Sequence, residues 1–122
     1  MAYLYIGRQK VSPILMRDYQ VASLSGATPV VNLNNYTIYT AGTTLTGLTI
    51  VNPDPIPEDF VAQINFTTGN TAFTIDSTNI EWFGDNVSNV QGPVVRTNCN
   101  YTIVFYYTGT VLRGVIQGSS IS

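Results

Sequence analysis

The stretch that most constrains the fold of this chain runs from Asn100 to Gln117, NYTIVFYYTGTVLRGVIQ. It opens with the run Tyr101–Tyr107, whose β-branched and aromatic residues fit a pleated strand better than a helix. Gly109 then allows a turn with positive φ, and residues 111–116 run back. The stretch therefore predicts a β-hairpin.

The first strand of this hairpin carries apolar side chains on both faces. Neither face is suited to water, because an exposed apolar strand pairs readily with other chains. We therefore expect this strand to be central in a sandwich or to be covered by a partner chain.

A period of two is clearest between residues 60 and 66, where apolar side chains recur at every second position and only Val61 departs from the pattern. This alternation predicts a strand with one face on the core. Two shorter inward-facing pairs follow, Phe73 with Ile75 and Ile80 with Trp82.

Turn residues and prolines divide the remaining extended segments. Asn34-Asn35 is a turn signal between residues 30–33 and 36–40. Gly47, inside the segment 44–51, indicates a bulge or a close backbone approach. The three prolines of residues 52–57 exclude regular structure. We interpret this run as a stiff connector between two halves of the sandwich, or between an arm-bearing part and the core.

These patterns amount to eight or nine short strands and no helix, in a chain of 122 residues that corresponds to one domain. The predicted class is all-β: a single antiparallel β-sandwich, Ig-like or jelly-roll-like, with an extended N-terminal arm. We expect residues 1–29 to be a docking arm and linker. Residues 30–122 are the expected sandwich body, with the Pro-rich connector 52–57 within it.

The charges are distributed unevenly along the chain. Arg8, Lys10 and Arg17 precede the first acidic residue, whereas residues 54–85 hold six acids and no base. A basic arm on an acidic body could bind the body of a neighbouring copy or an acidic partner. Three positive charges are too few for a nucleic-acid footprint, so no nucleic-acid partner is predicted.

The overall charge content is low. Only 10% of residues are charged, against about 25% in ordinary soluble domains. Desolvation of short neutral side chains costs little free energy, which favours close contact between chains. The alternative is a β protein whose weakly charged surface has no role in contact between chains.

The residue types exclude most catalytic chemistry. With no histidine and one cysteine, zinc sites and Cys-His nucleophiles are excluded. Cys99 is expected to be a small packed residue beside a strand start. Glu81 beside Trp82 could belong to a sugar site, but alternation favours a core Trp with a surface Glu. The protein is predicted not to be an enzyme, and no catalytic, cofactor or metal residue is assigned.

Acidic and glycosylation patterns have simple interpretations. Asp54, Glu58 and Asp59 could gather calcium, but their spacing matches no EF-hand, and a solvated acidic loop is favoured. Four N-x-S/T sequons occur in a chain rich in Asn and Thr, where chance matches are expected. The sequons are at Asn35, Asn65, Asn86 and Asn100.

The N-terminus lacks the features of a signal peptide, and no segment is long and apolar enough for a membrane span. Synthesis in a cytoplasm and no membrane partner are therefore expected.

Two parts of the chain resemble virion proteins of tailed bacteriophages. The opening YLYIGRQKVSPIL is similar to short N-terminal modules that attach a fibre or decoration to the particle. The second half is similar to small β-domains of head-fibre and auxiliary capsid proteins of gut phages, the crAss-like group among them. The residues that carry this second likeness are 60–66, Phe73, 80–84 and 100–103.

The resemblance implies a location and a binding arm. The chain has no repeats, no coiled-coil heptads and no large receptor-binding head, which favours a short capsid-surface protein over a tail fibre. Residues 1–16 would be the docking arm, and Arg8, Lys10 and Arg17 would meet acidic surface on the capsid or on a sister copy. The apolar contacts of the arm would be Tyr3, Leu4, Tyr5, Ile6, Val11, Ile14 and Leu15.

The predicted function is that of a non-enzymatic phage structural protein on the outer surface of the virion, assembled in the host cytoplasm. It would be an auxiliary capsid (decoration) or head-fibre protein whose arm binds the major capsid protein through many weak contacts. A homo-oligomer, as a trimer or a lattice contact, is expected. The alternative is a carbohydrate-binding β-sandwich module used in host or mucus attachment.

Overall fold

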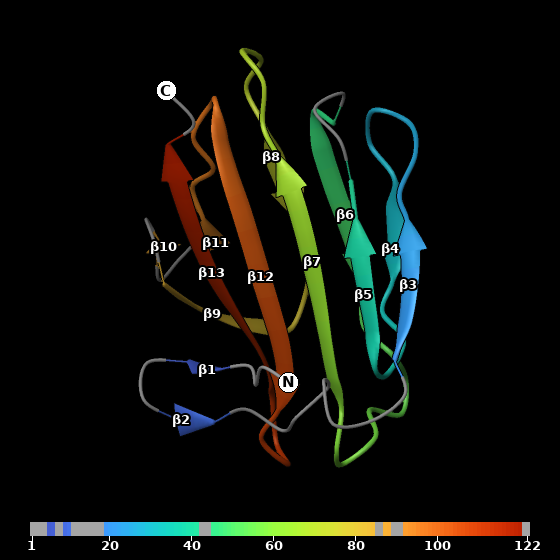
Figure 1. Ribbon diagram of the computed structural model, residues 1–122. Coiled ribbons are helices and arrows are strands. Elements are labelled where there is room, and N and C mark those ends of the chain that lie inside the picture. Colours follow the sequence, from blue (N-terminus) through green and yellow to red (C-terminus); the bar gives the residue numbers. More distant parts are fainter. Residues whose placement is uncertain are drawn as a thin grey trace.

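The computed structural model describes residues 5–6, 9–10, 19–41, 45–84, 87–88 and 92–120, and its regular elements are all strands (Figure 1). The first six strands are β1 (Tyr5–Ile6), β2 (Gln9–Lys10), β3 (Gln20–Ser23), β4 (Val30–Asn32), β5 (Thr37–Thr40) and β6 (Gly47–Val51). The others are β7 (Val61–Thr67), β8 (Thr74–Asp76), β9 (Ile80–Gly84), β10 (Val87–Ser88), β11 (Gly92–Pro93), β12 (Cys99–Tyr107) and β13 (Leu112–Ser120).

Two sheets form the body. The larger has the strand order β3-β5-β7-β12-β13-β9, and the smaller has the order β4-β6-β8. Figure 1 shows the smaller sheet behind the first strands of the larger one. From β3 to β8, successive strands alternate between the two sheets, and each lies parallel to the next strand of its own sheet. This half of the body is therefore a coil in which each turn adds one strand to each sheet, as in a two-sided β-solenoid.

The predicted all-β class is confirmed in the described residues, but the antiparallel arrangement is wrong for five strand pairs, all of which are parallel. The reason lies in the connections. Parallel strands need a crossover between them, and in the four parallel pairs from β3 to β8 the crossover passes through the opposite sheet. The Asn34-Asn35 turn is real but joins β4 to β5, which lie in different sheets. The Pro-rich connector likewise crosses between the sheets, from β6 in the smaller one to β7 in the larger one.

The predicted C-terminal hairpin is confirmed. Strands β12 and β13 pair antiparallel along nine positions, and β12 pairs antiparallel with β7 on its other side. Gly109 has a φ of +99° in the turn, as expected of glycine at this position. The apolar strand is therefore central in the larger sheet.

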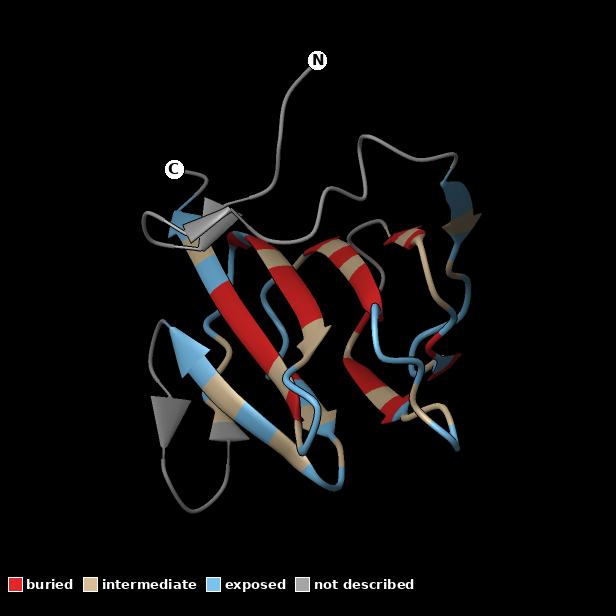
Figure 2. Cartoon of the chain, turned by 90° about the horizontal axis from the view of Figure 1, so that it is seen from below, coloured by how far each residue is buried: buried red, intermediate tan, exposed pale blue. Residues whose placement is uncertain are grey.

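One continuous core joins the two sheets. The alternating segment 60–66 buries its four apolar residues of one face, and both predicted inward pairs, Phe73 with Ile75 and Ile80 with Trp82, pack against the same cluster. The cluster also contains Val31, Leu48 and Ile50 of the smaller sheet, so the two sheets pack face to face. Figure 2 shows the buried positions alternating with less buried ones along the central strands.

The N-terminal region has two described parts. Strands β1 and β2 pair with each other, from Tyr5 with Lys10 to Ile6 with Gln9. Strand β3 also falls within the expected arm and linker, yet it is the edge strand of the larger sheet, and Ala22 and Leu24 pack against the core. The body of the fold thus includes residues from position 20 onward. The described residues include no helix that is long and apolar enough to cross a membrane.

Candidate functional site: a groove beside the Pro-rich connector

A groove of about 660 Å³ lies where the Pro-rich connector, the β8–β9 turn and the β12–β13 turn meet. These three segments are distant in sequence. The parallel pairing of β6 with β8 brings the first two together, and the antiparallel pairing of β12 with β7 places the β12–β13 turn at the same end of the strands. The lining residues are Val51, Asn52, Pro53, Asp54, Ile56, Thr78, Asn79, Tyr107, Thr110, Val111 and Leu112.

Asn52 fixes one wall of the groove. Its Nδ2 donates a hydrogen bond of 2.9 Å to the carbonyl oxygen of Thr78, which ties the connector to the β8–β9 turn. Its Oδ1 is buried and accepts no hydrogen bond from the described residues. Asn79 has a φ of +58°, a left-handed conformation that Asn tolerates better than most residues.

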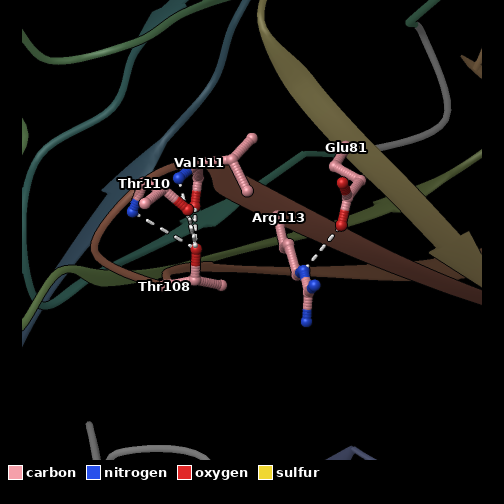
Figure 3. A network of polar contacts seen from close by, with 5 residues as sticks. All are labelled: Glu81, Thr108, Thr110, Val111 and Arg113. Atoms are coloured by element: carbon pink, nitrogen blue, oxygen red, sulfur yellow. Dashed lines mark hydrogen bonds and ion pairs between the residues drawn. The ribbon is translucent and has the colours of Figure 1, made fainter.

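The opposite wall is the β12–β13 turn, which is held by Thr108 (Figure 3). The amide and the Oγ1 of Thr108 both donate to the carbonyl oxygen of Val111, each at 3.0 Å, and Oγ1 accepts a 3.2 Å hydrogen bond from the amide of Val111. These contacts hold Thr110 and Val111 at the rim of the groove.

The groove offers hydrogen-bonding groups and one aromatic ring. Tyr107 is half-buried, and Asp54 is the one carboxylate among the lining residues. Such a set can bind a neutral polar molecule by stacking and hydrogen bonding. It does not supply the facing pair of carboxylates that glycoside hydrolysis uses. No group of three or more potential metal ligands occurs among the described residues.

The acidic residues near the connector do not converge. The Asp59 carboxylate accepts hydrogen bonds from the Tyr36 hydroxyl and, at 3.3 Å, from Asn35 Nδ2, so it anchors the connector to the β4–β5 turn. Asp54 and Glu58 are exposed. This arrangement agrees with a solvated acidic loop.

A second polar cluster lies on the outer face of the larger sheet. Arg113 Nε contacts Glu81 Oε1 at 2.7 Å (Figure 3), and the Arg113 guanidinium lies 5.1 Å from the centre of the Phe83 ring. Hydrogen bonding to Tyr106 and then to Glu81 raises the pKa of Arg113 above its ordinary value. The pair is exposed and screened by solvent, so its contribution to stability is small. As predicted, Glu81 points outward and Trp82 inward, where Trp82 Nε1 donates to Ser77 Oγ at 3.2 Å.

Seven of the ten predicted contact residues of the arm lie outside the residues that the structure describes. Tyr5, Ile6 and Lys10 lie in β1 and β2, whose backbone pairing is described. The contact role of the arm therefore stays a prediction. Outside the described residues are Tyr3, Leu4, Arg8, Val11, Ile14, Leu15 and Arg17.

The burial of Cys99 agrees with its prediction from the sequence, whereas the groove is not predicted by it. Cys99 is buried as the first residue of β12, as predicted, and its Sγ contacts the carbonyl oxygen of Thr97 at 3.4 Å. The groove was not predicted. The pairing of Asn52 with Thr78 leaves no local signal, because it depends on which turn of the coil stacks on which.

Comparison with known proteins gives no relative. No protein-family model, no curated protein and no solved structure matches this chain.

Proposed function

We propose that this protein is a non-enzymatic structural protein of a bacteriophage particle. It acts as an auxiliary capsid (decoration) or head-fibre protein on the outer surface of the virion. Its N-terminal arm binds the major capsid protein, with Tyr3, Tyr5 and the neighbouring apolar residues as the contact groups. The observation that carries the proposal is the arm sequence, which joins apolar strand residues to three basic side chains.

The surface chemistry of the body supports this role. A low charge content reduces the desolvation cost of packing against neighbouring proteins. Many weak contacts of this kind add up when the copies are joined in a homo-oligomer, because one bound arm raises the effective concentration of the other arms at neighbouring lattice sites. The arm can therefore bind weakly as a single copy and still hold the protein on a particle.

A capsid-binding assay tests the proposal. Full-length protein and a variant lacking residues 1–16 are mixed with empty capsids, and bound protein is measured after sedimentation. The variant is expected to lose binding while its circular-dichroism spectrum remains that of a β protein. The full chain with Val94→Ala is the matched control, because Val94 is exposed and lies outside the arm. Full-strength binding of the shortened chain would show that the docking-arm idea is wrong.

A carbohydrate-binding module is the second candidate, and the groove is the observation that favours it. The Tyr107 ring and the amides of Asn52 and Asn79 surround one cavity, which suits a neutral sugar. A glycan array tests it: binding that is lost in Tyr107→Ala supports this function. A blank array would remove it and leave the capsid assay unaffected.

A further inference from the structure

The coil ends at one side of the molecule in the outer edges of two strands. Strand β3 is the terminal strand of the larger sheet and β4 is the terminal strand of the smaller one. Figure 1 shows the two strands at the same end, one behind the other. No described strand pairs with the outer edge of either.

The backbone groups of these edges have known directions. The amides of Gln20 and Leu24 donate to β5 and its flank, to the carbonyl oxygens of Tyr36 and Thr40 at 2.9 and 2.8 Å. Since alternate residues of a strand point their amides to opposite sides, the amides and carbonyls of Val21 and Ser23 point away from β5.

The same geometry holds in the smaller sheet. The amide of Leu33 donates to Val51 and the carbonyl of Pro29 accepts from Thr49, at 3.0 and 3.1 Å. Val30 and Asn32 alternate with these residues, so their backbone amides and carbonyls point away from β6.

Neither edge strand contains a charged residue or a proline. Natural edge strands are blunted by charged residues, prolines, bulges or short length; β3 and β4, with the sequences QVAS and VVN, have only the short length. Val21 is 63% exposed, Val30 is 58% exposed and the preceding Tyr19 is 43% exposed. No Asp, Glu, Lys or Arg occurs anywhere between Tyr19 and Pro53. Depletion of charge with exposed apolar and aromatic groups is the composition of an interface core.

We propose that this end of the coil is a self-association surface, and that its partner is a second copy of the chain related by a two-fold axis. Antiparallel pairing of β3 with its symmetry mate would join Val21 of one copy to Ser23 of the other. Pairing of β4 in the same way would join Val30 to Asn32. The larger and smaller sheets of the two copies would each become continuous, and the exposed side chains of Val21 and Val30 would gain cross-strand neighbours on the outer faces.

A second copy fits this surface better than a single strand from another protein. An added peptide strand covers one sheet edge, whereas two edges end together here and a copy presents two matching edges. Segment 19–53 carries no charged side chain, so two copies do not repel each other there. An acidic or basic partner would gain no electrostatic attraction from it. The strands are short, so the contact is weak and depends on concentration. The inference is independent of capsid binding.

Solution measurements on the full chain test the proposal. Sedimentation velocity and amide NMR spectra are recorded from micromolar to millimolar concentrations. A monomer–dimer equilibrium is expected, with concentration-dependent shifts and slower exchange at the amides of Val21, Ser23, Val30 and Asn32. The double variant Val21→Lys with Val30→Lys places like charges across the axis and is expected to weaken the dimer at least about tenfold. Val94→Lys is the matched control, because Val94 is 59% exposed and lies outside both edge strands.

Three results would overturn the proposal. One is a monomer at every concentration. Another is protection of the same amides at every dilution, which would mean that another part of the same chain occupies the edges. The third is a dimer that the double lysine variant and the Val94→Lys control affect equally. Both substituted positions are exposed in the monomer, so the lysines are expected to leave the fold intact. A thermal unfolding curve close to that of the wild type shows that the variant is folded.

Discussion

Phe66→Ala is expected to remove a large part of the stability of this domain. Phe66 is 2% exposed on β7, and its ring stacks on Phe73 at 5.0 Å and on Tyr101 at 5.3 Å between centroids. Truncation of a buried Phe costs about 3–5 kcal/mol, and the lost ring pairs place this site toward the upper half of that range. Small domains are stable by about 5–15 kcal/mol, so the substitution removes at least about a quarter of that stability and nearly all of it at the lower end of the range.

Urea denaturation followed by circular dichroism measures this cost. Phe66→Leu keeps most of the buried volume and loses the ring stacking, so it is expected to cost about 1.5 kcal/mol. Val94→Ala, at an exposed position, is the control and is expected to change stability by less than about 0.5 kcal/mol. The reasoning is refuted if Phe66→Ala costs no more than this control while the denaturant slope stays constant.

Three further predictions follow from single contacts. Gly114→Ala would place a Cβ 2.8 Å from Trp82 Cζ3, so a loss of about 1–3 kcal/mol is expected in the same urea assay; an unchanged midpoint would mean that the indole moves freely. Thr108→Ala removes the hydroxyl contacts to Val111 and is expected to cost about 1 kcal/mol, with no loss arguing that the turn does not depend on them. The buried Cys99 thiol is expected to resist a thiol reagent until the protein unfolds; labelling of the folded protein at the rate of a free thiol would contradict its burial.

The sequence predicts the buried face of a strand correctly where that face depends only on the alternation within the strand. Alternation at residues 60–66 and at Ile80 and Trp82 identified the buried faces correctly, because the period of a strand does not depend on its neighbours. Gly47 was also read correctly as a close approach. A Cβ there would lie 3.1 Å from the carbonyl oxygen of Thr74 in β8.

Strand direction could not be predicted in the same way. A half-buried strand shows the same alternation in a parallel and in an antiparallel sheet, and the turn at Asn34 and Asn35 looks the same at a hairpin and at a corner between sheets. The parallel coil also decides which loops meet. The groove formed by Asn52, Thr78 and Tyr107 is therefore a property of the topology and leaves no local pattern.

The proposed virion location is tested most directly by antibody labelling of virus particles purified from a lysate that contains this protein, viewed by negative-stain electron microscopy. The account predicts label in many copies at regular positions on the outer surface of the capsid. Particles that carry no label, from a lysate in which the free protein is readily detected, would contradict it.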